Sequence, residues 1–466
     1  MSVVFSDQPQ SQLPISSNRK IPPGPRGKPI IGNLHDFRKD ILTTLESAAR
    51  EYGEIVHFKV GPREIFLLND PYYIQHVLQT NHHNYRKGWA LVRTKILLGE
   101  GLLTSEGDFW LHQRRLIQPA FHRKRIAAFG QMMTDCTSEM MEAWQPYIES
   151  GQPLNLTEEM MNLTLNVVCQ TLFSTHITDA ERAVVKDAME VVLLFGLKNV
   201  TRPPFMEKLP TLGNQQARKA IHQLDKIVYR IIQERRAHPQ DDEKSDLFTM
   251  LMSVQDEDTG ESMDDRQVRD EIMTLFLAGH ETTANTLAWT FYLLSENPTM
   301  TDALWAELDR VLDGQVPAVE NLSNLPYTQA VLQESMRLYP PAWVISRQAI
   351  NDDEIGGYPI PMGSAVIVSP YVMHRNPNYW EKPEQFNPTR FLDDSRPWRP
   401  PFSYFPFGGG ARQCIGMNFA MMEAQLILAT VAQKYQLHLV PTTKVEPEAL
   451  LTLRPRNGLP MTIEWR

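Results

Sequence analysis

One apolar stretch in the middle of the chain constrains the fold more than any other segment. Residues 264–297 are predicted to form a single helix that Ser262 caps and that ends before Pro298. Residues 272–294 within it are apolar on almost every face, so other elements must surround this helix in a large protein. At about 1.5 Å per residue, the helix would be roughly 50 Å long.

This stretch is a poor candidate for a membrane span, because His280, Glu281 and Asn285 interrupt it. Residues 1–20 contain no apolar run long enough for a signal peptide or a membrane span. The prolines and glycine at 22–25 that follow them cannot be helical. We therefore expect a mobile tail over 1–20, a single domain over 21–466, and a soluble protein without an integral membrane anchor.

The composition excludes several classes of function. Among 466 residues, 46 are basic and 55 acidic, and a formal net charge of −9 argues against nucleic acid as the main partner. The three cysteines, Cys136, Cys169 and Cys414, are too few for a secreted disulfide scaffold of this length and suit a cytoplasmic protein. No CxxC pair occurs in the sequence, which argues against a structural zinc ribbon.

Most of the remaining chain is predicted to be helical, with two short β-regions. A hairpin is expected over 54–68, around Gly61 and Pro62, and a second β-region over 355–369. Apolar residues three and four apart predict helices over 109–117, 127–144, 180–197, 214–237, 301–312, 328–338 and 417–434. The expected fold class is mainly α with small β-sheets.

The segment PFGGGARQCIG, residues 406–416, is the most informative about chemistry. Its glycines would let the backbone approach a flat, bulky group without interference from a Cβ atom. Cys414 just precedes a helix, whose positive end favours a thiolate, and a thiolate is a metal ligand or a nucleophile. Because no histidine or second cysteine lies nearby, a single axial bond to a metal held mainly by another group is the simplest interpretation. The alternative, a buried inert cysteine, is the one we favour for Cys136 and Cys169.

Phe407, Gly410, Arg412, Cys414 and Gly416 together resemble the haem-binding signature of the cytochrome P-450 family of haem-thiolate monooxygenases. The resemblance implies the fold of that family, with the long central helix over haem b, which is iron protoporphyrin IX. It further implies that Cys414 is the proximal iron ligand, that Arg412 pairs with a haem propionate and that Phe407 shields the sulfur. Gly410 and Gly416 are then expected to border the cofactor.

The long helix contains a second match, because residues 278–283, AGHETT, resemble the oxygen-binding motif of the family. Ala278 and Gly279 would lie beside the cofactor, with Gly279 removing a side chain where the helix passes close to a ligand. Glu281 and Thr282 place a carboxylate and a hydroxyl in an apolar helix, and the resemblance implies that they deliver protons to bound O2. The alternative is that Thr282 only bonds back to the preceding helical turn.

Two further patterns resemble the same family. Glu334 and Arg337 share a helix face, and with Arg390 they resemble its ExxR motif, in which two guanidiniums share one carboxylate in a structural role. The family usually has an acidic residue where Thr389 stands.

Trp110 and Arg114, one helical turn apart, resemble the early helix that contacts a haem propionate. Arg347 is expected to be a further propionate partner, and His374 is a weaker candidate for the same role.

The positions that the family uses for substrates are apolar here, which predicts a large apolar substrate such as a fatty acid, a terpenoid or a carotenoid. The residues assigned to this role are Trp89, Leu97, Phe195, Trp343, Val344 and Leu451. The sequence has no nucleotide-binding glycine motif and no segment like a flavin domain, so the electrons must come from another protein. We expect a ferredoxin or flavodoxin with its reductase. It would dock on the basic cluster of Arg114, Arg115, Arg123, Lys124 and Arg125, unless that cluster is only a solvated helix end.

Three functions remain open at this point. A monooxygenase that inserts one oxygen atom of O2 into a C–H bond is the leading hypothesis. A haem-thiolate peroxygenase or isomerase would need no electron donor, and Glu281 and Thr282 argue against it, because those classes often lack the acid–alcohol pair. A non-enzymatic haem sensor usually has a second domain, and the sequence indicates none.

Overall fold

The computed structural model describes residues 20–173, 178–200, 209–237, 246–253, 260, 262–392 and 398–466. The tail predicted over 1–20 lies outside them, apart from Lys20.

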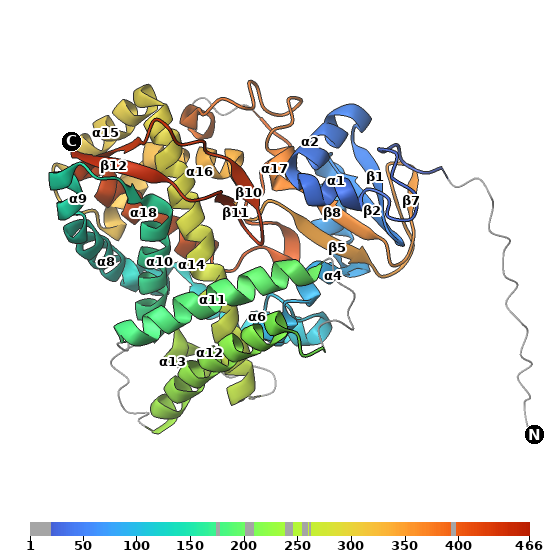
Figure 1. Ribbon diagram of the computed structural model, residues 1–466, viewed down its shortest axis with the longest axis horizontal. Coiled ribbons are helices and arrows are strands. Elements are labelled where there is room, and N and C mark those ends of the chain that lie inside the picture. The colour runs from blue at the N-terminus through green and yellow to red at the C-terminus, as the bar shows by residue number, and fades with distance from the viewer. Residues whose placement is uncertain are drawn as a thin grey trace, which may run out of the picture.

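The long helix predicted from the apolar stretch is α14, Asp265–Glu296, which runs through the middle of the molecule (Figure 1). The prediction that Ser262 caps it was wrong. Asp264 is the cap, because its carboxylate accepts the Gln267 N–H at 2.7 Å while the Gln267 side chain accepts the Asp264 N–H. This reciprocal pair satisfies backbone groups that a serine two residues earlier does not reach.

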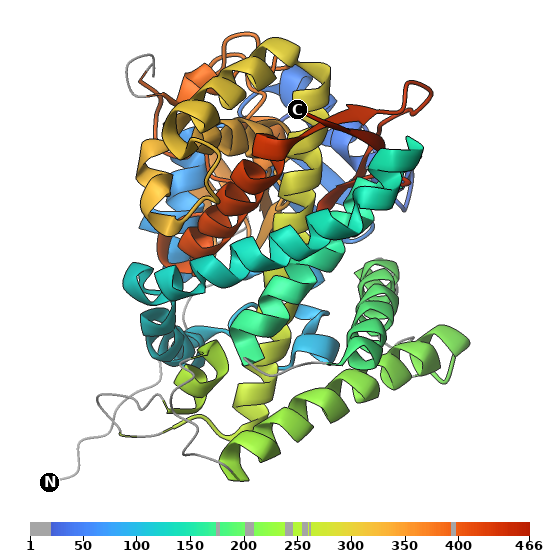
Figure 2. The same ribbon diagram turned by 90° about the vertical axis from the view of Figure 1, so that its left-hand side faces the viewer.

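Other helices enclose both halves of α14. The core around its second half is built from α8 Gly130–Ala143, α10 Leu156–Phe173, α15 Pro298–Leu312, α16 Pro326–Leu338 and α18 Met417–Lys434. The core around its first half is built from α5 Lys95–Leu98, α6 Gly107–Ile117, α10, α11 Asp179–Val200, α12 Leu212–Ala237 and α13 Leu247–Ser253. Figure 2 shows α10 and α18 crossing α14.

The β-structure gathers mainly on one side of the helices (Figure 1). The largest sheet among the described residues has the strand order β1-β2-β8-β5-β3. Its strands are β1 Ile55–Val60, β2 Arg63–Leu68, β8 Ala365–Val368, β5 Ile345–Ala349 and β3 Tyr85–Lys87, and only the β2–β8 pairing is parallel. The hairpin predicted around Gly61 and Pro62 is confirmed as β1 and β2.

The smaller sheets pair strands near the chain ends and within the second predicted β-region. They comprise β6 Asp353–Ile355 with β7 Tyr358–Ile360, β10 Pro447–Ala449 with β11 Leu453–Pro455, and β4 Leu154–Asn155 with β12 Pro460–Trp465 and β9 Tyr435–Leu439. Short helices complete the fold: α1 Leu34–Lys39, α2 Ile41–Tyr52, α3 Pro71–Gln75, α4 Trp89–Val92, α7 Arg123–Ile126, α9 Gln145–Ser150 and α17 Pro370–Met373.

The fold class predicted from the sequence, mainly α with small sheets, is confirmed. Each predicted helix is present, although 127–129 forms a 3-10 turn ahead of α8. Across the part of the chain that the structure describes, no helix combines the length and the apolar character needed to cross a membrane.

Candidate active site

The segment around Cys414 forms a tight loop that leads into α18. The Cys414 N–H donates to the Phe407 carbonyl at 3.0 Å, which closes the loop over the glycines. Gly410 has φ +67°, and a Cβ atom there would lie 1.9 Å from the Leu78 carbonyl oxygen. This glycine is needed because the loop backbone lies against another stretch of backbone, a reason that the sequence did not reveal.

Cys414 itself has an accessible side chain within crowded surroundings. Its side chain is accessible to water, yet enough protein surrounds it that burial raises the pKa of its thiol. The Gly416 N–H and the Arg114 guanidinium act in the opposite direction. Burial thus opposes the thiolate that the helix start would favour. A metal cation bonded to the sulfur would produce the thiolate, because coordination strongly favours the deprotonated form.

A stripe on α14 is accessible in the same way. Between Val268 and Phe291, the residues of α14 that are not buried are Leu275, Ala278, Gly279 and Thr282. Their spacing of three and four residues puts them on one face of the helix. Helices and loops cover the other faces of α14, so this stripe is the part of the helix that a ligand can reach. The Gly279 side of the helix also faces α10, where an added Cβ atom would lie 3.0 Å from Val168 Cγ2, so this glycine permits close helix packing.

Cationic side chains gather beside the cysteine loop. Lys87 on β3 lies directly opposite Arg347 on β5, and both are close enough to Arg412 for it to lower their pKa values. Burial, the larger cause, helps to lower the pKa of Lys87 to about 7 and that of Arg347 to about 10. Glu106 accepts the Lys87 N–H at 2.6 Å and forms an ion pair with Arg412. One carboxylate therefore faces three cations.

Trp110 and Arg114, the predicted propionate partners on α6, both contact the cysteine loop. The Arg412 guanidinium lies 4.3 Å from the centre of the Trp110 ring, and Arg114 Nη1 donates to the Gln413 carbonyl at 2.6 Å.

Sequence reasoning missed Lys87 and Glu106, because nothing local distinguishes them from surface charges. The weaker candidate His374 is fully buried in a different place, where its Nε2 accepts the Phe405 N–H at 2.9 Å.

These residues fit an iron porphyrin. Cys414 offers one sulfur donor, and the small side chains of Ala278 and Gly279 in the accessible stripe of α14 suit the approach of a flat apolar group. The excess of positive charge at Lys87, Arg347 and Arg412 suits a group with two carboxylates, since buried charges need partners of opposite sign. Haem has this combination of a metal that takes an axial ligand, an apolar face and two propionates.

The predicted structural group is formed, since one carboxylate pairs with two guanidiniums, those of Glu334, Arg337 and Arg390. Arg337 donates to both Glu334 oxygens at 2.7 and 2.8 Å, and Arg390 Nε donates to Glu334 Oε1 at 3.2 Å. Glu334 and Arg337 are completely buried. Arg337 also donates to the carbonyls of His374, Pro383 and Gln385, so the group fixes the backbone that leads toward the cysteine loop.

Glu281 and Thr282, the predicted catalytic residues, do not bond to each other. Thr282 Oγ1 donates to the Ala278 carbonyl at 2.8 Å, which is the back-bonding alternative considered above. Glu281 is buried and its Oε1 accepts from Thr452 Oγ1 at 2.7 Å, whereas its Oε2 has no hydrogen-bond partner within the described ranges. Burial raises the pKa of the Glu281 carboxyl.

The same face of α14 is bonded to the C-terminal hairpin. Asn285 Nδ2 donates to Thr452 Oγ1 at 3.0 Å, and Trp289 Nε1 donates to the Leu453 carbonyl at 3.1 Å. Together with Glu281, these residues hold the β10–β11 turn on the helix.

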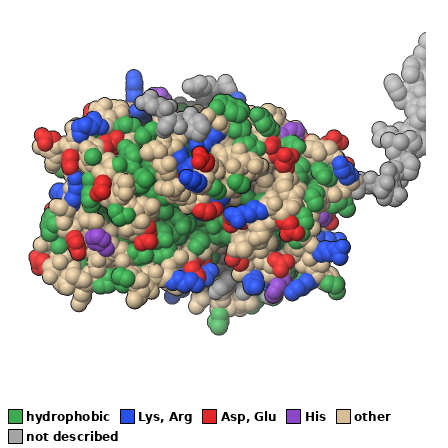
Figure 3. Space-filling model, turned by 90° about the horizontal axis from the view of Figure 1, so that it is seen from above, with side chains coloured by type: hydrophobic (Ala, Val, Ile, Leu, Met, Phe, Trp, Pro, Cys, Tyr) green, Lys and Arg blue, Asp and Glu red, His purple; other side chains and the backbone are tan. Residues whose placement is uncertain are grey.

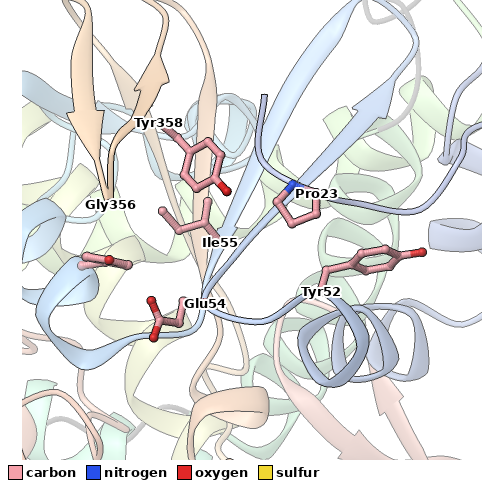
Figure 4. A pocket seen from close by; sticks show the side chains of 7 residues that line it. Pro23, Tyr52, Glu54, Ile55, Gly356 and Tyr358 are labelled. Carbon is pink, nitrogen blue, oxygen red and sulfur yellow. The ribbon is translucent and has the colours of Figure 1, made fainter. Parts of the chain in front are cut away.

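The six residues assigned to the substrate have different surroundings. Leu97, Phe195 and Trp343 are buried, and Val344 and Leu451 are half-buried against apolar clusters. The guanidiniums of Arg63 and Arg93 lie 4.4 and 5.6 Å from the centre of the Trp89 ring, so this side chain already has two cationic neighbours. A separate pocket of about 220 Å³, lined by Tyr52, Glu54, Tyr73 and Tyr358 among others, includes none of the predicted site residues (Figure 4).

The chain is similar to known proteins over most of its length. The family model for cytochrome P-450 matches residues 22–460. Cyclooctat-9-en-7-ol 5-monooxygenase of Streptomyces melanosporofaciens is 36% identical over 421 residues, which cover 90% of each chain. Pentalenene oxygenase of Streptomyces avermitilis is 31% identical over 435 residues, 93% of this chain and 95% of that one. The chloroplastic carotene epsilon-monooxygenase of Arabidopsis thaliana is 32% identical over 441 residues, 89% of this chain and 80% of that one.

Proposed function

Because this chain belongs to the cytochrome P-450 family and is a haem-thiolate monooxygenase, we propose that it hydroxylates a large apolar molecule with electrons from a separate protein. The observations that most support the proposal are the accessible thiol of Cys414 and the accessible stripe of α14. Together they would offer a metal ligand and an apolar surface, so that a C–H bond can be held against the cofactor.

The proposed reaction inserts one oxygen atom of O2 into a C–H bond, releases the other as water, and consumes two electrons and two protons. Bound haem supplies the activation of O2. The residues of the chain bind and orient the reactants and supply protons. Cys414 would hold the iron, and Trp110, Arg114, Arg347 and Arg412 would neutralise the propionates.

Proton supply is assigned to Thr282 and Glu281. The Thr282 hydroxyl lies on the accessible stripe of α14 and donates its hydrogen bond to the Ala278 carbonyl. Because a reactant can reach it there, the hydroxyl could donate to the reactant instead. Glu281 keeps a proton more readily than an exposed carboxyl does, because burial raises its pKa, and this suits a proton donor.

The substrate class we propose is a terpenoid or a carotenoid. The relatives named above are a monooxygenase of cyclooctat-9-en-7-ol, a pentalenene oxygenase and a carotene monooxygenase, and they support this class. Hydrophobic side chains also gather in the hollowed middle of one face of the molecule, as Figure 3 shows. Burial of apolar surface at about 25 cal/mol per Å² would provide most of the affinity.

The electron donor we propose is an acidic ferredoxin or flavodoxin that docks over α6 and α7. Arg115, Arg123, Lys124 and Arg125 are exposed there, and Leu111 adds an exposed apolar side chain to the same surface. Arg114 is half-buried beneath them and bonds to the Gln413 carbonyl next to Cys414. The surface thus lies close to the proposed iron ligand, and its positive charge would attract an acidic partner.

We further infer that the cofactor is non-covalent haem b and that the protein is cytoplasmic. The sequence has no CxxCH motif for covalent haem attachment. Cys136 and Cys169 are buried and are not joined in a disulfide, which suits a reducing compartment.

The ligand assignment is tested with Cys414→Ser in the purified holoenzyme. We expect the reduced carbon monoxide complex to lose the Soret band of a thiolate-bound haem, while Cys169→Ser, a buried cysteine elsewhere, keeps it. An unchanged spectrum in Cys414→Ser would contradict the proposal. Product formation from peroxide alone, with no gain from an electron donor, would favour the peroxygenase instead.

A further inference from the structure

Three consecutive charged residues, Arg269, Asp270 and Glu271, lie near the start of α14, and all three are buried. Their exposed fractions are 7%, 4% and 0%. Successive residues of a helix point about 100° apart, so the three side chains cannot share one face. Burial of adjacent charges in this way costs free energy unless each finds specific partners.

Their partners are main-chain groups of residues 97–102, the segment formed by the end of α5 and the turn that follows it. Arg269 Nη1 donates to the Leu97 carbonyl at 2.8 Å. The Glu100 N–H donates to Asp270 Oδ2 at 2.8 Å, and the Leu102 N–H donates to Glu271 Oε2 at 2.9 Å. One turn of α14 therefore holds the segment through three of its backbone groups.

Two glycines allow the segment to lie directly on the helix. A Cβ atom on Gly99 would fall 2.0 Å from a carboxylate oxygen of Asp270, and one on Gly101 would fall 2.2 Å from Thr274 Oγ1. Gly99 also has φ +55°, a conformation that strongly favours glycine. Since any larger residue would displace the backbone, the contact depends on both the acids and the glycines.

Arg269 extends the same contact to α12. Its Nε donates to Asp225 Oδ1 at 2.7 Å, and its Nη1 also donates to Asp270 Oδ1 at 2.9 Å. Figure 2 shows α12 crossing the molecule at this end of α14. Arg269 thus joins three elements, namely α12, α14 and the 97–102 segment.

The far side of the 97–102 segment faces the cationic side chains near Cys414. The Leu102 carbonyl accepts from Lys87 Nζ at 2.9 Å, and three residues later the Ser105 carbonyl accepts from Lys87 Nζ at 2.7 Å. The segment therefore spans the distance between α14 and the residues beside the cysteine loop. Leu97 packs in one apolar cluster with Phe276, next to the accessible stripe of α14.

We propose that Arg269, Asp270 and Glu271 are positioning residues that hold the 97–102 segment as one wall of the substrate site and thereby set the size of ligand that the site accepts. This inference rests on the proposed haem-thiolate function, because the site is the one bordered by Cys414 and α14. None of the three touches the reacting atoms.

The test compares a small and a bulky azole on the purified holoenzyme, each followed by the shift of the Soret band. Imidazole reports whether the iron site is intact, whereas econazole also fills the space next to the 97–102 segment. In Asp270→Ala and Gly101→Ala we expect the econazole dissociation constant to change by about tenfold and that of imidazole by less than about twofold. Asp270→Asn keeps an acceptor oxygen for the Glu100 N–H and should restore most of the wild-type affinity for econazole.

Asp309→Ala is the matched control, since it removes a surface carboxylate that pairs with Arg466 far from this segment. It should leave both constants unchanged. Hydrogen exchange of the segment gives a second readout, and in Gly101→Ala the amides of Glu100 and Leu102 should exchange faster than in the wild type. Equal shifts for the two azoles, or unchanged exchange and unchanged econazole affinity, would overturn the inference. Absence of a thiolate-type carbon monoxide spectrum in the wild type would refute the proposed function instead.

Discussion

Lys87 and Arg347 lie directly opposite each other on the antiparallel strands β3 and β5. Like charges in this arrangement destabilise a strand pair, and Arg412 adds a third cation nearby. The fold therefore accepts a local repulsion that Glu106 compensates only in part. A bound group with two carboxylates would relieve it, so the repulsion is a sign of preparation for the cofactor.

Arg347→Met tests this interpretation. Without the guanidinium the cofactor-free protein should keep its thermal midpoint or gain slightly, because a repulsion disappears. Haem should leave about tenfold faster, since a charge-assisted contact is lost. Transfer of haem to apomyoglobin measures the rate. Arg86→Met, an exposed neighbour on β3, should leave the rate unchanged, and faster haem loss in both variants would contradict a specific role for Arg347.

Thr282→Ala should separate electron consumption from product formation. If the hydroxyl supplies protons to bound O2, its loss should lower product formation by at least about tenfold and raise the peroxide released per electron. Both are measured in one assay with a reduced donor. Thr290→Ala removes a buried hydroxyl that also bonds back along α14. In this control variant, product formation should still match electron consumption. If Thr282→Ala formed as much product per electron as the wild type, the hydroxyl would have no role beyond its bond to the Ala278 carbonyl.

Charge reversal at Lys124 and Arg125 should weaken the encounter with the electron donor. Both are exposed, so the fold should tolerate the change. The Michaelis constant for an acidic ferredoxin should rise by about tenfold at low salt, and the difference should shrink as ionic strength increases. Arg310→Glu on α15, away from this surface in Figure 1, provides the control. An unchanged constant would exclude this surface from docking.

Glu271→Gln should change how stability depends on pH. Burial and the neighbouring Asp270 raise the pKa of Glu271 to about 8, although the Leu102 N–H and Lys87 oppose this. Between pH 4.5 and about 8 the folded chain therefore holds a proton that the unfolded chain has released. Stability from this group must then fall as pH rises through that window, by at most about 1.4 kcal/mol per pH unit.

Glutamine cannot titrate, so the stability of the wild type relative to Glu271→Gln should fall between pH 5 and pH 8. Unfolding midpoints of the two proteins at both pH values measure it. Parallel profiles would mean that Glu271 ionises normally in the folded protein.

Local patterns in the sequence predicted the local structure well. The limits of α18 match the predicted helix over 417–434, because its apolar pattern and the flanking glycine lie within one segment. Strands β3 and β5 were not predicted, since each is short and half polar and they pair across a separation of about 260 residues. No pattern within Tyr85–Lys87 indicates a partner so far along the chain.

In the candidate site, too, the sequence indicated residues that belong to a local motif and missed those that depend on distant parts of the chain. Residues within a motif of the family, such as Cys414, Glu334 and Arg337, could be selected as candidates from the sequence. Lys87 and Glu106 could not, because their role depends on burial, which tertiary packing alone decides. The contact that requires Gly410 was missed for the same reason, since the backbone that it lies against, at Leu78, is remote in sequence.

Thr452 gives its hydroxyl hydrogen to Glu281 and receives the amide of Asn285, so a single side chain of the C-terminal hairpin sets the surroundings of the proposed proton donor. The neighbouring Leu451 is among the residues assigned to the substrate. If both assignments hold, a substitution in this turn that widens the range of accepted substrates should also move the Thr452 hydroxyl that bonds to Glu281. We therefore expect substrate range and the yield of product per electron to change together, so that selection for one would alter the other.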